Sequence, residues 1–393
     1  MQYRENPRNH ERLSALGFGC MRFARSGASI DQEKADRLLS QALEAGVNYF
    51  DTAYLYPGSE VCLGRFMKAH GCRDRMSIAT KLPQYLVKKP ADFDRFFDEE
   101  LQRLQTDHVD YYLMHMLNDD KSWERLCALG VREWIAAKKA SGAIRNIGFS
   151  FHGGTAQFKA LLDAYDWEFC QIQFNYMDEH SQAGVEGLEY AHAKGLPVII
   201  MEPLRGGKLV NGLSTAARRE FERMEPRRSP ADWGLRWIWN HPEVTVVLSG
   251  MNAAEQVTEN CRIASESLPG ALTETELALY PRVLTAIHGA MKVGCTGCGY
   301  CQPCPKGVDI PTCFAAYNAS YADGYVNALR EYMMCTTLRK VRSNAGLCVK
   351  CGKCEQHCPQ HLPIRDALDS VKKRLETPIY RIAAAVAPRI MKY

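Results

Sequence analysis

The sequence predicts an α/β protein in which a (β/α)8 barrel is followed by a smaller, mostly helical, cysteine-rich module. Three observations indicate this fold class. Eight strand-like runs alternate with eight helix-like stretches over about the first 265 residues, which is the size of such a barrel. The chain of 393 residues is longer than the barrel needs, and half of its 16 cysteines fall in two short runs near its end. We expect the barrel over residues 1–290 and the module, with a helical tail, over 291–393.

The strands are predicted from short apolar runs that are bounded by polar or turn-forming residues. They cover residues 16–21, 47–52, 76–80, 109–114, 144–149, 169–174, 197–201 and 244–248. Alternation of strands with helices would also suit an open doubly wound sheet. No G-x-G-x-x-G turn follows the first run, which weakens that alternative.

The helices are predicted from apolar residues that recur every three to four positions. In the stretch 30–45, for example, Ala35, Leu38, Leu39 and Ala42 share one face. The other barrel helices are expected at 60–70, 92–104, 122–141, 155–164, 182–194, 230–240 and 253–264. Further helices are expected at 273–289, as a link to the module, around 321–341 and in the tail from 365 to 393.

The two cysteine runs carry the strongest chemical signal in the chain. The first contains Cys295, Cys298, Cys301 and Cys304, and the second contains Cys348, Cys351, Cys354 and Cys358. Three thiolates spaced by two residues can surround one 4Fe–4S cluster, and a fourth cysteine followed by proline can reach a second cluster. Paired C-x2-C spacing also suits tetrahedral zinc. A disulfide scaffold is a poorer alternative, because nothing marks the chain as secreted.

The second run matches the C-x2-C-x2-C-x3-C-P pattern in full, and the region resembles a two-cluster ferredoxin module. The resemblance implies that Cys295, Cys298 and Cys301 share one cluster with Cys358. It implies that Cys348, Cys351 and Cys354 share the other with Cys304. The first run departs from the pattern, because it has one residue fewer before Cys304.

Bulk properties exclude several classes of protein. A net charge of +4 over 393 residues does not suggest nucleic-acid binding. The first ten residues contain no apolar core of a signal peptide, and no apolar run approaches the length of a membrane span. We expect a protein of the reducing cytoplasm. The oligomeric state is left open.

Polar side chains stand at successive predicted strand ends. Asp51 ends the second strand and Tyr56 follows in its loop, Lys81 follows the third strand, and His115 follows the fourth. Because function in such barrels lies at the C-terminal ends of the strands, these four side chains are expected to meet at one rim. Each residue alone is more often structural, but four in order predict an active site.

The motifs around these residues resemble those of the aldo/keto reductase family. They are D-T-A-Y-L-Y at 51–56, T-K-L at 80–82, D-Y-Y-L-M-H at 110–115, G-F-S at 148–150, Q-I-Q-F-N at 171–175, E-P-L-R-G-G at 202–207 and E-N at 259–260. The whole chain is similar to the branch of that family with an appended 4Fe–4S domain. The resemblance implies that Asp51, Tyr56, Lys81 and His115 are catalytic.

The chemistry of the four residues supports those roles. A free phenol has a pKa near 10, and a neighbouring ammonium from Lys81 is expected to lower it. Asp51 would orient Lys81, and His115 would hydrogen-bond the substrate oxygen. Tyr56 would then act as the general acid in carbonyl reduction and as the base in alcohol oxidation.

The predicted cofactor pocket departs from the family pattern. Implied cofactor-binding residues are Ser150, Gln171, Arg205, Gly206, Gly207, Gly250, Gln256 and Asn260. Phe151 stands where an Asn usually follows the serine, and Met201 where a Tyr usually stacks on nicotinamide. Gly250, Met251 and Gln256 replace the residues that usually hold the 2′-phosphate of NADPH. These changes favour NADH over NADPH.

A flavin such as FMN is the alternative cofactor. Clusters move single electrons whereas nicotinamide moves a hydride, and a flavin can convert between the two. Arg205, Gly206 and Gly207 could cradle its phosphate.

We therefore predict an oxidoreductase that acts on a carbonyl or alcohol substrate and is coupled to electron transfer through two 4Fe–4S clusters. An expected protein partner is a ferredoxin or flavodoxin. Alternatives are a flavin-containing iron–sulfur oxidoreductase, or an electron-transfer subunit that uses the barrel as a scaffold.

Overall fold

The computed structural model describes all of residues 1–393 except Ala28, Thr296, Cys298, Asp323, Arg339, Lys340, Pro359 and 391–393, together with the side chains of 290, 322 and 385–390. The predicted ligand Cys298 therefore lies outside the described residues. The chain divides into two compact units. The first comprises Met1–Val210 and Arg228–Leu277, and the second comprises Asn211–Arg227 and Ala278–Tyr393.

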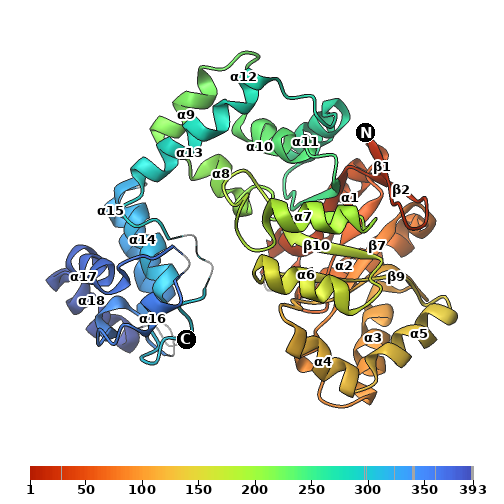
Figure 1. Cartoon of the computed structure of the whole chain (residues 1–393), viewed down its shortest axis with the longest axis horizontal. Coiled ribbons are helices and arrows are strands. Elements are labelled where there is room, and N and C mark those ends of the chain that lie inside the picture. The colour runs from red at the N-terminus through yellow and green to blue at the C-terminus, as the bar shows by residue number, and fades with distance from the viewer. Residues whose placement is uncertain are drawn as a thin grey trace. The chain divides into compact units, whose positions relative to one another are not determined.

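The first unit is a closed barrel of eight parallel strands, as the sequence predicts (Figure 1). The strands are β3 (Leu16–Gly19), β6 (Tyr49–Asp51), β7 (Ser77–Leu82), β8 (Val109–Met114), β9 (Ile144–Phe151), β10 (Phe169–Gln173), β11 (Val198–Met201) and β12 (Val244–Ser249). They pair in chain order, and β12 closes the barrel on β3, where Val247 lies opposite Leu16.

Helices surround the strands: α1 (Gln32–Glu44), α2 (Ser59–His70), α3 (Ala91–Leu104), α4 (Asp120–Ala128), α5 (Val131–Ala140), α6 (Thr155–Ala164), α7 (Gly184–Ala193), α10 (Pro230–Trp239) and α11 (Ala254–Glu266). The prediction of a single helix over 122–141 is wrong. Gly130 adopts a φ of 84° between α4 and α5, and this left-handed conformation, which glycine tolerates, ends one helix and starts the next.

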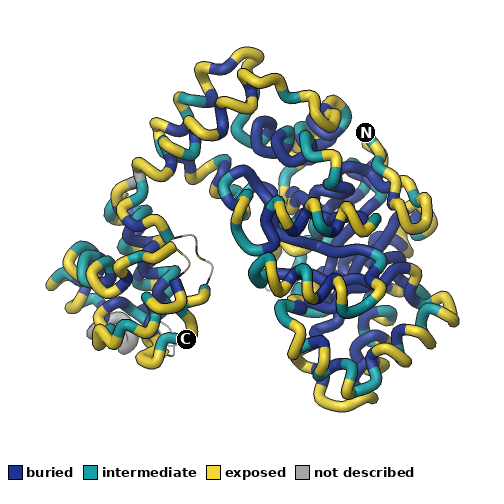
Figure 2. The backbone as a smooth tube through the Cα atoms, in the orientation of Figure 1, coloured by how far each residue is buried: buried dark blue, intermediate teal, exposed yellow. Residues whose placement is uncertain are grey.

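Helix α1 shows why these stretches fold as predicted. The Asp31 carboxylate accepts a hydrogen bond from the N–H of Lys34 at 3.0 Å and caps the first turn. Ala35, Leu38 and Leu39 are buried on the face that packs inward. Figure 2 shows the same division over the unit, with buried strands at the centre and exposed residues on the outer helix faces.

The barrel interior is packed with aromatic side chains and closed at its N-terminal end. The Tyr49 and Tyr111 rings lie 5.1 Å apart and those of Tyr111 and Phe169 5.0 Å apart. A hairpin that the sequence analysis missed, β1 (Tyr3–Glu5) with β2 (Arg12–Ser14), precedes the barrel. Arg4 on this hairpin donates to the carbonyls of Trp239 and His241 ahead of β12 and to that of Val244, its first residue. Substrate access is thereby left to the opposite, C-terminal end.

Short elements in the connecting loops were also missed. They are η1 (Cys20–Arg22), β4 (Arg25–Ser26), β5 (Ser29–Ile30), η2 (Arg73–Arg75), η3 (Gln84–Leu86), η4 (Arg205–Gly207), α8 (Lys208–Asn211) and α9 (Thr215–Glu222). They lack the length that makes a periodic pattern readable in sequence.

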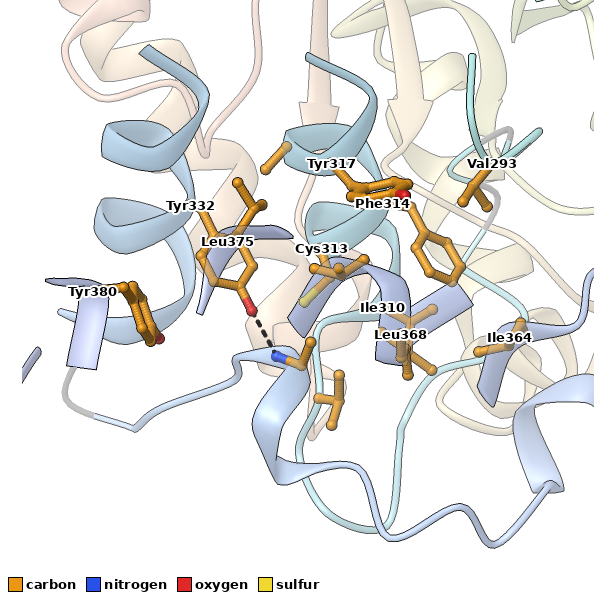
Figure 3. Packing of buried hydrophobic residues seen from close by; sticks show 14 of the residues in the cluster. Val293, Ile310, Cys313, Phe314, Tyr317, Tyr332, Ile364, Leu368, Leu375 and Tyr380 are labelled. Carbon is orange, nitrogen blue, oxygen red and sulfur yellow. Dashed lines mark hydrogen bonds between the residues drawn. The ribbon is translucent and has the colours of Figure 1, made fainter. Parts of the chain in front are cut away.

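The second unit is mostly helical: α12 (Glu274–Leu277) leads into it, followed by α13 (Leu279–Ala290), α14 (Ile310–Ala322), α15 (Tyr325–Tyr332), the π-helical turn η5 (Met333–Thr337), η6 (Ala345–Leu347), α16 (Lys353–Gln356), α17 (Ile364–Leu375) and α18 (Pro378–Ile390). Its core gathers apolar residues of α14 and α17 around Tyr332 (Figure 3). The Tyr332 hydroxyl accepts from the N–H of Ala345 at 2.8 Å and donates to Glu376 at 2.7 Å. These bonds fix η6 directly before the second cysteine run.

No helix within the described part of the chain is long and apolar enough to cross a membrane.

Candidate active site and cysteine cavities

The four predicted catalytic residues converge at the C-terminal end of the barrel. Asp51 ends β6, Lys81 lies near the end of β7, and His115 directly follows β8. These are adjacent strands, with Asp51 paired to Ala79 and Lys81 to Leu113. Tyr56 lies in the loop that follows β6. The parallel register therefore brings together side chains that are up to 64 positions apart in sequence.

Asp51 and Lys81 form a buried ion pair. The Lys81 ammonium lies 2.6 Å from both carboxylate oxygens of Asp51 and donates to the carbonyl of Thr52 at 2.7 Å. Both residues are at most 3% exposed. Burial acts to lower the pKa of Lys81, but the Asp51 carboxylate outweighs it and raises that pKa. The lysine is therefore held as a cation, in one orientation.

Tyr56 lies between this pair and His115. The Lys81 ammonium is 5.1 Å from the centre of the Tyr56 ring, and the rings of Tyr56 and His115 meet edge to face with centres 6.0 Å apart. Burial raises the pKa of Tyr56 and outweighs the lowering effect of Lys81. The prediction of a lowered phenol pKa is therefore wrong in net direction, although Lys81 acts in the predicted sense.

His115 is a neutral imidazole in this site. Burial, followed by the charges of Lys81 and His152, lowers its pKa to about 3. Only 8% of the residue is exposed, and within the described structure its Nδ1 has no hydrogen-bond partner. A neutral ring at the mouth can hydrogen-bond a substrate oxygen without carrying charge.

Ser150 and Gln171 lie side by side on β9 and β10. The Ser150 hydroxyl accepts from the N–H of Met116 at 2.8 Å, and Met116 has a φ of 54°. The Gln171 amide nitrogen lies 3.7 Å from the sulfur of Met201, whereas its Oε1 has no partner in the part of the chain described. Gln171 is 1% exposed, so this buried acceptor has room for a donor from a bound water or ligand.

In the loop after β11, Arg205 pairs with neighbouring protein groups. Its guanidinium lies 3.1 Å from the Asp178 carboxylate and 2.9 Å from the Met177 sulfur. Gly206 and Gly207 adopt positive φ values of 67° and 90°, a left-handed conformation that glycine tolerates.

The last three predicted cofactor residues belong to the segment that follows β12. Gln256 accepts from the N–H of Asn252 at 2.9 Å, and Asn260 donates to the hydroxyl of Ser249 at 3.0 Å. Gly250 follows β12 directly. The side-chain bonds of Gln256 and Asn260 thus fix the shape of the loop that contains Gly250.

Arg22 is the residue that sequence reasoning missed. A side chain at Gly206 would come within 2.7 Å of its guanidinium, and one at Gly250 within 3.3 Å of its stem. Its guanidinium also lies 3.5 Å from the carbonyl of Gly206. Arg22 therefore joins the two loops. It closely follows the first strand, so the strand-end rule applied to β3 would have found it.

Two cavities in the second unit are lined by the cysteine runs. Cys304, Cys348, Cys351 and Cys354 line one, so the last cysteine of the first run faces three from the second. Cys295, Cys301 and Cys358 line the other. Ile310, the first residue of α14, lines both and lies between them. This is the crossed grouping that the ferredoxin resemblance implies, apart from the undescribed Cys298.

The chemistry of the donors at these cavities suits iron–sulfur clusters. Four sulfur atoms around one small space are the ligand set of a 4Fe–4S cluster. Although the spacing before Cys304 is one residue shorter than the pattern, Cys304 still lines the cavity of Cys348, Cys351 and Cys354. Burial is the main cause that raises the pKa of the Cys354 thiol, and the charge of Glu355 is the next. Cys348 and Cys304 raise that pKa further.

Comparisons with protein-family models agree with this division. Residues 15–271 match the model described as the aldo/keto reductase family, and residues 294–362 match a 4Fe-4S dicluster domain.

The curated relatives align with the barrel part of the chain. An uncharacterized oxidoreductase YrpG of Bacillus subtilis is 26% identical over 68% of this chain and 92% of its own. L-galactose dehydrogenase of Arabidopsis thaliana is 27% identical over 65% of this chain and 85% of its own. The solved structure of the aldo-keto reductase AKR11C1 from Bacillus halodurans, in a holo form, aligns with a TM-score of 0.60 at 24% identity. It covers 72% of this chain and 96% of its own, and it supports the fold.

Proposed function

Because this chain belongs to the aldo/keto reductase family and is an oxidoreductase with an appended 4Fe–4S dicluster domain, we propose that it interconverts a small carbonyl compound and its alcohol at the barrel mouth. We further propose that two clusters pass electrons to or from that reaction. The observation that supports the chemistry is the meeting of Asp51, Lys81, Tyr56 and His115. L-galactose dehydrogenase, a relative, is named for the dehydrogenation of a sugar.

In the proposed reduction, Tyr56 gives its hydroxyl proton to the carbonyl oxygen of the substrate. Its raised pKa keeps that proton in place at neutral pH until the oxygen becomes basic. Lys81, fixed by Asp51, stabilises the phenolate that remains. The neutral imidazole of His115 positions the substrate oxygen. In alcohol oxidation Tyr56 takes the proton back.

A nicotinamide bound at this mouth would supply the hydride. The pocket fits such a ring in one respect, because the orphaned Oε1 of Gln171 can accept an N–H of the carboxamide, with Ser150 beside it. Arg22, which lies against the loop of Gly206 and Gly207, provides a guanidinium for a pyrophosphate. Gly250, Met251 and Gln256 offer no cation to a 2′-phosphate, and this supports NADH over NADPH.

The second unit would hold two 4Fe–4S clusters, one at each cysteine cavity. Cys304, Cys348, Cys351 and Cys354 would bind one. Cys295, Cys301, Cys358 and the undescribed Cys298 would bind the other. Bound clusters would supply one-electron transfer. A reducing, cytoplasmic setting and a ferredoxin or flavodoxin partner belong to the same proposal.

FMN is a second candidate cofactor. It is favoured by the cysteine cavities. Clusters transfer one electron at a time and the carbonyl reaction needs two, so coupling them requires a group that accepts or gives electrons either singly or in pairs. Met201 in place of a stacking aromatic points the same way. The pairing of Arg205 with Asp178 leaves Arg22 as the better phosphate partner. Anaerobic purification and release of the bound groups would decide between flavin and nicotinamide.

The proposal is tested by Tyr56→Phe, assayed anaerobically against a panel of carbonyl compounds with NADH. We expect kcat to fall by about 10²–10⁴-fold while iron content stays the same. Tyr54→Phe is the matched control: Tyr54 lies in the same loop, but its hydroxyl donates to Glu99 at 2.7 Å. Equal activity of the two variants would remove the phenol from the mechanism. Cluster reduction without any small-molecule turnover would instead favour the electron-transfer subunit.

A further inference from the structure

The charge of the chain is divided unevenly. Residues 291–393 contain 15 Lys and Arg but only 7 Asp and Glu, a net charge of +8, while the whole chain carries +4. Residues 1–290 are therefore acidic, at −4. Such an asymmetry acts on partners through the long-range field rather than on the fold.

The basic residues of the second unit are not spread evenly between the two cysteine cavities. Lys306 and Arg365 line the cavity of Cys304, Cys348, Cys351 and Cys354. The other cavity is lined by Cys295, Gly299, Cys301, Ile310, Pro311, Phe314, Cys358, Gln360, Leu362 and Ile364. None of these residues carries a fixed charge, as far as the described residues show. The two cavities thus differ in electrostatic surroundings.

Two more lysines are sequence neighbours of residues that line this cavity: Lys350 stands between Val349 and Cys351, and Lys353 between Gly352 and Cys354. Together with Lys306 and Arg365 they form what we call the basic rim, and all four are exposed. Arg365 pairs with Glu355 at 2.8 Å and Lys350 pairs with Asp369. Within the described chain no carboxylate lies within 4 Å of the Lys306 or Lys353 ammonium, so these two charges remain available.

An apolar centre accompanies the basic rim. Val349 lines the cavity and is 58% exposed, and Leu347 is 36% exposed just before the second run. Cys351 is exposed, whereas Cys358 at the other cavity is buried. A small apolar centre within a charged rim is the composition of a transient protein contact, and redox encounters use the smallest interfaces.

We propose that the basic rim is the docking face for an acidic one-electron carrier protein, which exchanges electrons through the cavity of Cys304, Cys348, Cys351 and Cys354. This inference rests on the proposed function, because it requires a cluster at that cavity. In each encounter the carrier and the module exchange one electron: one is oxidised by one electron and the other reduced by one.

The charge of the basic rim acts on the rate at which the carrier associates. Opposite charges on a carrier and the basic rim steer the encounter and raise the association rate, and salt screens that effect. The exposed Cys351 brings a ligand sulfur to the surface at the same place, which shortens the electron path. An acidic partner that docked at the uncharged cavity would gain neither benefit.

The test uses the full-length, anaerobically purified protein and a reduced, strongly acidic plant-type 2Fe–2S ferredoxin as the probe. Stopped-flow mixing measures the second-order rate of module reduction from about 0.02 M to about 0.5 M salt, over which the screening length falls several-fold. The variant is Lys306→Glu with Lys353→Glu. The matched control reverses two exposed charges on α2, Arg65→Glu with Lys68→Glu.

For the wild type we expect a rate that falls steeply with salt. The Lys306 and Lys353 variant should be at least about tenfold slower at low salt and should approach the wild type at high salt. The α2 control should match the wild type. A rate that is independent of salt, or equal in all three proteins, would overturn the inference.

Further readings of the same samples separate this inference from the proposed function. Iron content and reduction by dithionite report the clusters, and iron-free protein would overturn both. Faster reaction with a basic haem carrier, or binding of the basic rim to anionic phospholipid vesicles in preference to the ferredoxin, would overturn the docking inference alone. So would self-association that disappears in the Lys306 and Lys353 variant, because it would make a second copy of this chain the occupant.

Discussion

Lys81 and Asp51 form a bidentate contact in which the ammonium lies 2.6 Å from both carboxylate oxygens, and neither residue is more than 3% exposed. A pair so far from water is sensitive to the loss of one member. The remaining charge would be buried without compensation, which typically costs about 3–5 kcal/mol.

We therefore expect Asp51→Asn to lower the free energy of unfolding by about 3 kcal/mol and to reduce kcat, because Lys81 would lose both its charge and its orientation. The double variant Asp51→Asn with Lys81→Met should regain much of the stability but none of the activity. Urea denaturation together with steady-state kinetics provides the measurement. A single variant as stable as the wild type would show that the pair contributes nothing to the fold.

His115 predicts a dependence of stability on pH. Its pKa is about 3 in the folded protein, against an ordinary value of 6.5 in the unfolded chain. The unfolded chain therefore binds a proton first as the pH falls. The stability that is present above pH 6.5 should be lost between pH 6.5 and 3, by up to about 4 kcal/mol.

In His115→Asn the free energy of unfolding should fall less steeply between pH 7 and pH 4 than in the wild type, because the contribution of His115 is missing. The control His192→Asn changes an exposed histidine on α7 and should keep the slope. Because His115 is neutral near pH 6.5, we expect the pH profile of activity to show no inflection there that arises from this residue. An inflection there that disappears in His115→Asn would contradict a neutral imidazole.

The buried acceptor of Gln171 predicts two effects of opposite sign. In Gln171→Leu the orphaned Oε1 is removed, so the protein without cofactor should be more stable by about 1 kcal/mol. Cofactor affinity should fall by about tenfold, since one hydrogen bond is lost. Gln173→Leu is the contrasting variant, because Gln173 donates to Asp178 at 2.6 Å and its removal should destabilise the protein. Thermal melts with and without NADH distinguish the two.

The sequence predicts the barrel and the convergence of the four catalytic candidates well, for a physical reason. Buried parallel strands appear as continuous apolar runs, and the predicted strand 109–114 agrees with β8 at both ends. Parallel strands place their C-terminal ends at one rim, so the strand ends alone are enough to group Asp51, Lys81 and His115.

Other features depend on balances that a sequence pattern does not contain. The pKa of Tyr56 is set by burial against the charge of Lys81, and burial wins. The ion pair of Arg205 with Asp178 and the place of Arg22 between Gly206 and Gly250 arise from loop geometry. Gly130 could have been recognised as a break within the stretch 122–141, but the amphipathic pattern continues across it.

The crossed cysteine grouping predicts which cluster each residue supports. Cys304 lines the cavity of the second run, so Cys304→Ser should impair the cluster of Cys348, Cys351 and Cys354 rather than that of its own run. Cys358→Ser should impair the other cluster. Iron should fall from about eight to about four atoms per chain in either variant, because each 4Fe–4S cluster holds four.

The two single variants should leave different electron paramagnetic resonance signals, because the surviving cluster is the basic, exposed one in Cys358→Ser and the apolar one in Cys304→Ser. Cys335→Ser is the control, since Cys335 lines neither cavity in the described structure and should keep all the iron. The spectrum left by Cys304→Ser should match the one left by Cys351→Ser, because both variants lose the same cluster. A match with the spectrum left by Cys295→Ser instead would mean that each cysteine run binds its own cluster, and the crossed grouping would then be wrong.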